Sequence, residues 1–105
     1  MTREENIKER LINFSTLLCE ISSTIGGTTF TIHSPEKYCS LFHGSIWPES
    51  LDPADWRVFC FEPGIFEFCD RKGITISSIT EQNPIAVARW IEKNVKTLNK
   101  ENEQL

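Results

Sequence analysis

The chain has 105 residues, of which 39% are hydrophobic and 25% are charged, and its 15 acidic and 11 basic side chains leave a formal net charge of −4. This length is that of one domain, and this composition is typical of a globular protein rather than a disordered one. The negative charge argues against binding to nucleic acid, which depends on Lys and Arg side chains that release phosphate counterions, and against attraction to an anionic membrane.

The first 25 residues predict one long helix, over about 3–25. Thr2 and Glu5 form a capping-box pattern at its start, and Gly26-Gly27 would end it, because glycine tolerates the left-handed conformation common after a helix. Such a helix would be about 35 Å long at 1.5 Å per residue, longer than one face of this domain requires. Its apolar residues recur at alternating steps of four and three, as Ile7, Leu11, Phe14, Leu18, Ile21 and Ile25.

The middle of the chain is rich in strand signals. Thr28–His33 alternates, so that Phe30 and Ile32 share one face, and a second strand is expected near Tyr38–His43. The segment from Gly44 to Trp56 is expected to be irregular, because its two prolines disfavour regular strand pairing. The expected strands are 28–33, about 38–43, 56–61, 66–70 and 74–79.

A second helix is predicted over about 84–98. Asn83 is a suitable N-cap, and Pro84 fits the first helical position, where its missing N–H removes no hydrogen bond. The polar tail 99–105 is expected to fray. The connections between strands are short, which favours antiparallel pairing. We therefore predict a single α+β domain over 1–105, with two layers: a mainly antiparallel sheet of about five strands flanked by an N-terminal and a C-terminal helix.

The segment FCFEPGIFEFC (59–69) predicts a hairpin around Pro63-Gly64. If Glu62 pairs with Ile65, Phe61 faces Phe66 and Phe59 faces Phe68, and all four rings would lie on the buried face. The two thiols of this hairpin would then lie on the opposite face, as diagonal neighbours too far apart for a disulfide. The carboxylates of the hairpin would share that face, where such groups are ordinarily solvated. That face is predicted to carry Val58, Cys60, Glu62, Ile65, Glu67 and Cys69.

Residues that could perform chemistry are few. No closely spaced Cys or His pair typical of zinc sites occurs, and no nucleotide-binding fingerprint is present. One thiol- or metal-dependent site remains as an alternative, because folding of the first hairpin could bring Cys39, His33 and His43 together. We otherwise expect no enzyme activity, no bound metal and no cofactor.

Two surfaces are candidates for binding another protein. Trp47 and Trp56 flank an acidic segment that contains Glu49, Asp52 and Asp55, which would suit a partner with a basic surface. The seam of the first helix forms the second candidate. Part of it, represented by Leu11 and Leu18, could extend beyond the sheet and pair with a partner or a second copy. For each surface the alternative is a purely structural role.

The sequence therefore predicts a small, acidic, non-enzymatic interaction domain of the inhibitor, immunity, chaperone or adaptor type. A homodimer through the first helix is a further hypothesis, which Leu11→Glu or Leu18→Glu would test. No secretory signal follows the charged N-terminus, and no apolar stretch approaches the length of a membrane span, so a cytoplasmic location is expected.

Overall fold

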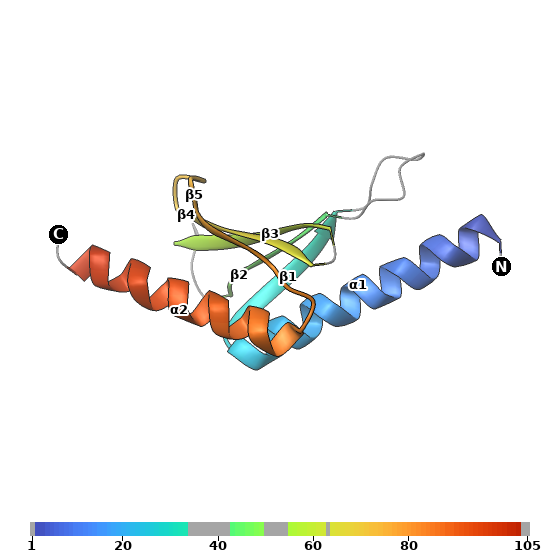
Figure 1. The fold of residues 1–105 in the computed structure, drawn as a ribbon, viewed down its shortest axis with the longest axis horizontal. Helices are drawn as coiled ribbons and strands as arrows, with labels where there is room; N and C mark the ends of the chain where they lie inside the picture. Colours follow the sequence, from blue (N-terminus) through green and yellow to red (C-terminus); the bar gives the residue numbers. More distant parts are fainter. Residues whose placement is uncertain (1, 34–42, 50–54, 63, 104–105) are drawn as a thin grey trace.

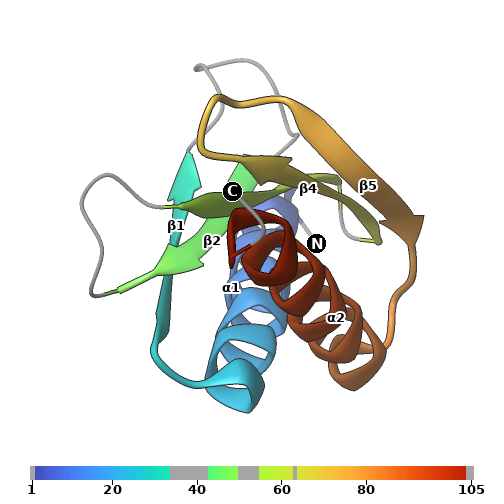
Figure 2. The ribbon, with the colours of Figure 1, turned by 90° about the vertical axis from the view of Figure 1, so that its left-hand side faces the viewer.

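The computed structural model describes residues 2–33, 43–49, 55–62 and 64–103. Two helices, α1 (Arg3–Ile25) and α2 (Pro84–Glu103), lie on the same face of one five-stranded sheet (Figure 1). The second view shows both helices beneath the strands (Figure 2). The strands are β1 (Thr28–His33), β2 (His43–Pro48), β3 (Trp56–Glu62), β4 (Ile65–Asp70) and β5 (Thr75–Thr80).

The sheet is a simple meander in the order β1-β2-β3-β4-β5, and every neighbouring pair is antiparallel. This confirms the predicted α+β fold with one antiparallel sheet and two flanking helices. The α2 helix continues to Glu103, so the tail expected to fray from residue 99 is helical over its first five positions.

The β2 strand lies where an irregular connection was expected, since it covers His43–Pro48 rather than a segment near 38–43. Residues 38–42 lie outside the described part of the chain. A hydrogen bond from the Glu49 N–H to the Gly27 carbonyl shows which residues of β1 and β2 direct their main-chain N–H and C=O groups toward each other. Because this direction alternates along a strand, the nitrogen of Pro48 points away from β1, on the side of β3. The described pairing of β2 with β3 ends at Ile46, before Pro48. The strand therefore tolerates Pro48 because no ladder bond at that position needs an N–H.

The β3–β4 hairpin has a different register from the predicted one. Glu62 does lie opposite Ile65, but Cys60 lies opposite Phe66, so Phe61 is an extra residue at a bulge. Because of this extra residue, every β3 side chain before the bulge lies on the opposite face of the sheet from the one predicted. Phe66 and Phe68 are buried as predicted, whereas Phe59 and Phe61 lie on the opposite face; the prediction of four rings on one buried face is wrong.

The core lies between the sheet and the helices. Trp56 stacks on Phe68, whose ring meets the edge of Trp90 from α2, and the Trp90 indole N–H donates to the Ser77 hydroxyl. The α1 helix contributes the middle of its predicted seam and α2 contributes its apolar stripe. The buried core residues are Phe14, Leu18, Ile21, Ile46, Trp56, Val58, Cys60, Phe66, Phe68, Val87, Ala88, Ile91 and Leu98.

Both helices extend beyond the sheet. The N-terminal part of α1 and the C-terminal part of α2 project from opposite ends (Figure 1), which makes the molecule elongated, at 54 × 25 × 24 Å. The expected length of the first helix relative to the sheet is thus confirmed.

Candidate binding surface on the outer face of the sheet

The outer face is the face of the sheet turned away from α1 and α2. The strand register arranges its side chains in three rows that run across the strands. The rows, each read from β1 to β5, are His33-His43-Phe61-Ile65-Thr80, then Thr31-Ser45-Phe59-Glu67-Ser78, then Thr29-Trp47-Arg57-Cys69-Thr75. In the first row Phe61 is the bulge residue, and the register pairs Ile65 with the adjacent Glu62.

Aromatic rings and one guanidinium form a continuous strip on this face. We name it the aromatic strip; it consists of His43, Trp47, Arg57, Phe59 and Phe61. The guanidinium carbon of Arg57 lies 5.3 Å from the Trp47 ring centroid and 6.0 Å from that of Phe59. Phe59 stacks on Phe61 with centroids 6.2 Å apart, and the His43 ring meets Phe61 edge-on at 6.0 Å.

The strip remains accessible within the described part of the chain. Phe61 is 41% exposed and Ile65, on the same face, is 40% exposed, while Trp47 and Phe59 are half-buried. Neither helix lies over this face (Figure 1). Solvent-exposed aromatic rings in contact with one another form an apolar surface, and burying such a surface under a partner lowers the free energy of the complex.

Arg57 has an unusual environment for a surface cation. It has ring contacts with Trp47 and Phe59, but its guanidinium makes no hydrogen bond or ion pair with any described residue. The two rings hold the side chain across the strip, and the fork of N–H donors is left without an acceptor among those residues. The arrangement suits a carboxylate supplied from outside.

A small cleft of about 190 Å³ adjoins Arg57. Its lining includes Phe59, Cys69, Asp70 and Arg71. The Asp70 carboxylate already accepts hydrogen bonds from the N–H groups of Lys72 and Ile74 in the β4–β5 turn. Both hydrogen bonds go to Oδ1 of Asp70, which shapes the turn, so the cleft is bordered by the side chains of Arg57 and Arg71 and by the second carboxylate oxygen of Asp70.

The predicted acidic surface is divided by the structure. Trp47 belongs to the aromatic strip, but Trp56 is buried on the inner face, so the two rings do not flank one surface. Glu49 is exposed after β2, whereas Asp55 is half-buried in a groove between the end of α1 and α2. Asp52 lies outside the described residues.

The predicted helix surface is also divided. Leu11 is 39% exposed, but Leu18 is fully buried against the sheet and cannot contact a partner. Assigning Leu18 to a binding surface was therefore wrong. The reason is geometric, because this part of the seam lies over the sheet and the exposed part lies toward the projecting N-terminal end.

Two of the three residues proposed for a thiol or metal site do come together. His33 lies directly opposite His43 at the end of the first hairpin, and both are exposed. Cys39 lies outside the described residues. Among the residues that are described, no group of three His, Cys, Asp or Glu side chains is placed to hold a metal ion.

The thiols of the second hairpin do not share a face. Cys60 is buried in the core, and Cys69 is buried on the outer face, where its sulfur lies 3.6 Å from the Thr75 hydroxyl. The predicted diagonal pair is therefore replaced by two separate structural side chains.

Arg57, Phe59 and Phe61 were not predicted from the sequence as surface residues. A signal for them was present, because Arg57 shares its alternation with both phenylalanines while Trp56 shares the other set with Val58 and Cys60. A charged residue in an alternating set favours the solvent face, but Glu62 belongs to the other set and gives the opposite indication, so the charges alone do not decide which set is buried.

No family model matches the sequence, and neither the curated proteins nor the solved structures contain a match to it. No helix in the described part of the chain combines the length and the apolar composition needed to cross a membrane.

Proposed function

We propose that this chain is a non-enzymatic protein-interaction domain that binds a partner protein through the outer face of its sheet. The observation that supports this most directly is the aromatic strip, in which Arg57 lies against the half-buried rings of Trp47 and Phe59 and lacks an acceptor among the described residues, while Phe61 beside Phe59 is exposed. Aromatic residues and arginine are enriched at protein interfaces and at the positions that dominate binding energy.

The chemistry of the strip indicates the kind of partner. The stacked rings of Phe59 and Phe61, on the same face of the sheet as Ile65, favour an apolar patch, and the open donors of Arg57 favour a carboxylate at its border. A protein surface or an extended segment with one acidic side chain among apolar ones supplies both. The predicted basic partner depends on Glu49, Asp52 and Asp55, and it stays a prediction.

A nucleic-acid ligand is less well supported, although bases can also stack on exposed rings. The three outer rows carry a single permanent cation, Arg57, together with the carboxylate of Glu67, and the whole chain has a net charge of −4. Affinity for nucleic acid depends on several cations along a phosphate backbone.

Comparative capture from a lysate of the host, quantified by mass spectrometry, tests the proposal when four baits are used. They are the wild type, Phe61→Ser, Arg57→Ala and Leu11→Ser. Leu11 is a matched control because its exposure, 39%, is close to the 41% of Phe61 and it lies on α1 rather than on the sheet. All four baits are first checked for equal folding by circular dichroism.

We expect a protein that is retained by the wild type and by Leu11→Ser and is lost from both strip variants. With that protein purified, the strip variants should bind at least about tenfold more weakly, which corresponds to about 1.4 kcal/mol. Retention of the same proteins by all four baits would contradict the proposal. Loss with Leu11→Ser alone would move the binding surface to the first helix.

A further inference from the structure

We propose that two copies of this chain pair through the exposed edge of β1, in antiparallel fashion and around a twofold axis at Thr31, to form one continuous sheet. The proposal concerns the edge of the sheet and is independent of the partner proposed for its outer face.

The hydrogen-bonding groups of β1 point alternately toward β2 and toward the open edge. The bond from Glu49 N–H to the Gly27 carbonyl joins two residues that are directly opposite in the register, so Thr29 and Thr31 also point their main-chain groups toward β2. Phe30 and Ile32 therefore point theirs away from β2, at the edge where the sheet has no further strand (Figure 2).

Thr28 points in the same direction as Phe30, but its carbonyl is already used. The hydroxyl of Ser22, at the end of α1, donates to the Thr28 carbonyl at 3.0 Å. The free groups of the edge are thus concentrated at Phe30 and Ile32, for which no hydrogen bond to a described residue outside the β1–β2 ladder occurs.

Natural proteins ordinarily protect such an edge with a lysine, a proline, a bulge or a covering element. The edge of β1 has none of these within its described residues, since its sequence is TTFTIH and its register with β2 is regular from Thr28 to His33. The opposite edge, β5, differs because its register shifts between Phe68 and Cys69 of β4. A register shift of this kind twists a strand away from further pairing.

A second copy fits this edge better than an arbitrary strand because the free groups are self-complementary. With Thr31 opposite Thr31 of the second copy, each Phe30 lies opposite an Ile32 and the two residues exchange main-chain hydrogen bonds. The same register places Phe30 beside Ile32 on the inner face, and Thr29 beside His33 on the outer face. No charged side chain of β1 opposes another of the same sign.

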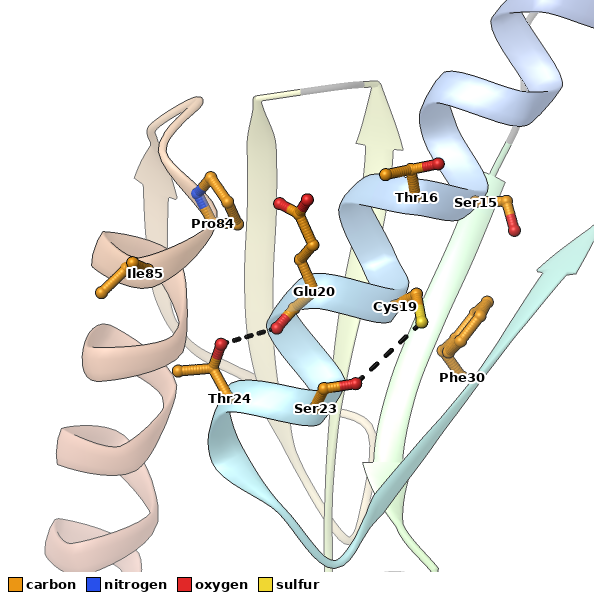
Figure 3. Close-up of a pocket in the computed structure, with 9 residues that line it drawn as sticks. All are labelled: Ser15, Thr16, Cys19, Glu20, Ser23, Thr24, Phe30, Pro84 and Ile85. Atoms are coloured by element: carbon orange, nitrogen blue, oxygen red, sulfur yellow. Dashed lines mark hydrogen bonds between the residues drawn. The ribbon is translucent and has the colours of Figure 1, made fainter.

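The layer beneath the edge leaves room for a second copy. A groove of about 690 Å³ crosses α1, from Pro84 and Ile85 at the start of α2 on one side to Phe30 of β1 on the other (Figure 3). On the side of β1, Ser15, Cys19 and Ser23 present small side chains, and the Phe30 ring lies beside Cys19. Phe30 is only half-buried in one chain. Pairing of two edges would cover this ring, and the small side chains permit the α1 helices of the two copies to approach.

Light scattering or sedimentation across a concentration series tests the proposal. We expect the wild type to reach twice the chain mass of 12.1 kDa. Thr31→Lys and Thr31→Glu, measured separately, place like charges together on the axis and should each weaken the dimer by about tenfold or more. An equimolar mixture of the two variants should restore a dimer, because the ammonium introduced in one copy would then face the carboxylate introduced in the other across the axis.

Two further variants keep the test decisive. Ile32→Pro removes an N–H that points to the open edge and leaves the ladder with β2 intact, so it should also give a folded monomer. Thr80→Lys changes the exposed end of β5 and should leave the dimer unchanged. A wild type of one chain mass at every concentration overturns the proposal, as does a dimer that persists in Thr31→Lys, or a mixture that fails to associate.

Discussion

Gly44 of β2 lies directly against the side chain of Leu18 of α1. A Cβ atom added at Gly44 would come 2.5 Å from Leu18 Cδ1 and 3.0 Å from Phe14 Cε1. The close approach of helix and strand at this point explains why a glycine stands inside β2, although glycine weakens most strands.

Gly44→Ala should therefore overpack the core and lower the free energy of unfolding by about 1–3 kcal/mol. Leu18→Ala alone should lower it by about 2–5 kcal/mol by leaving a cavity. In the double variant the new methyl occupies part of that cavity, so the combined loss should be smaller than the sum. Urea unfolding of the four proteins measures this coupling, and simple additivity would contradict the contact.

The bulge at Phe61 predicts unequal roles for the phenylalanines of the second hairpin. Phe68→Ala should cost about 3–5 kcal/mol of stability, because Phe68 is buried between Trp56 and Trp90. Phe61→Ala removes a ring from the surface and should cost well under half as much. Thermal or urea unfolding compares the two variants, and equal losses would favour the register with all four rings in the core.

Ser22 and Thr28 join the end of α1 to the start of β1. The hydroxyl groups lie 2.7 Å apart, and Thr28 Oγ1 also donates to the Ser22 carbonyl at 2.9 Å. Thr28→Val keeps the shape of the side chain but removes these hydrogen bonds, and it should lower the free energy of unfolding by about 1–2 kcal/mol. Thr24→Val is the control, because among the described residues the Thr24 hydroxyl bonds only to the Glu20 carbonyl, on the exposed side of α1. A comparable loss of stability in this variant would contradict a special role for the Ser22–Thr28 junction.

The cysteines should differ in their reactivity toward iodoacetamide in the native protein. Cys19 is exposed on α1, whereas Cys60 and Cys69 are buried. Peptide mapping after brief alkylation should find Cys19 modified and the other two protected until the protein is unfolded. Rapid native labelling of Cys60 would contradict its place in the core. The same peptide map reports whether Cys39 is alkylated in the native protein, and a lack of alkylation would count against the thiol-dependent alternative.

Elemental analysis of the purified protein tests the metal-dependent alternative. His33 and His43 lie opposite each other, but a zinc site ordinarily needs further protein ligands. Because we propose a binding domain, we expect purified protein to carry less than about half an equivalent of metal by elemental analysis. A full equivalent that disappears in both His33→Ala and His43→Ala would favour the alternative.

Much of the fold follows from local signals in the sequence. The Thr2 hydroxyl accepts from the Glu5 N–H at the start of α1, and Gly26 ends the helix with a φ of +77°. The Asn83 side chain accepts from the Ile85 N–H at the start of α2. Capping depends on a few adjacent residues, so single positions of the sequence are sufficient to predict it.

The outer face could not be predicted in the same way, because the facing of a strand depends on its register with other strands. Both alternating sets of β3 contain apolar residues, so the pattern alone does not decide whether Phe59 or Val58 is buried. One inserted residue, Phe61, then reverses the assignment. The β2 strand was missed for a related reason, since the effect of Pro48 depends on which neighbour its nitrogen faces.

The meander also has a consequence for the order in which the chain acquires its structure. Each strand pairs with the next one along the chain, so the whole sheet can assemble from short loops without distant segments having to meet. The packing of α2 beside α1 is different, because it joins the two ends of the sequence. The strands can therefore pair one after another as they emerge, whereas the Phe68 ring is covered by Trp90 only once α2 has been made and has packed against the sheet.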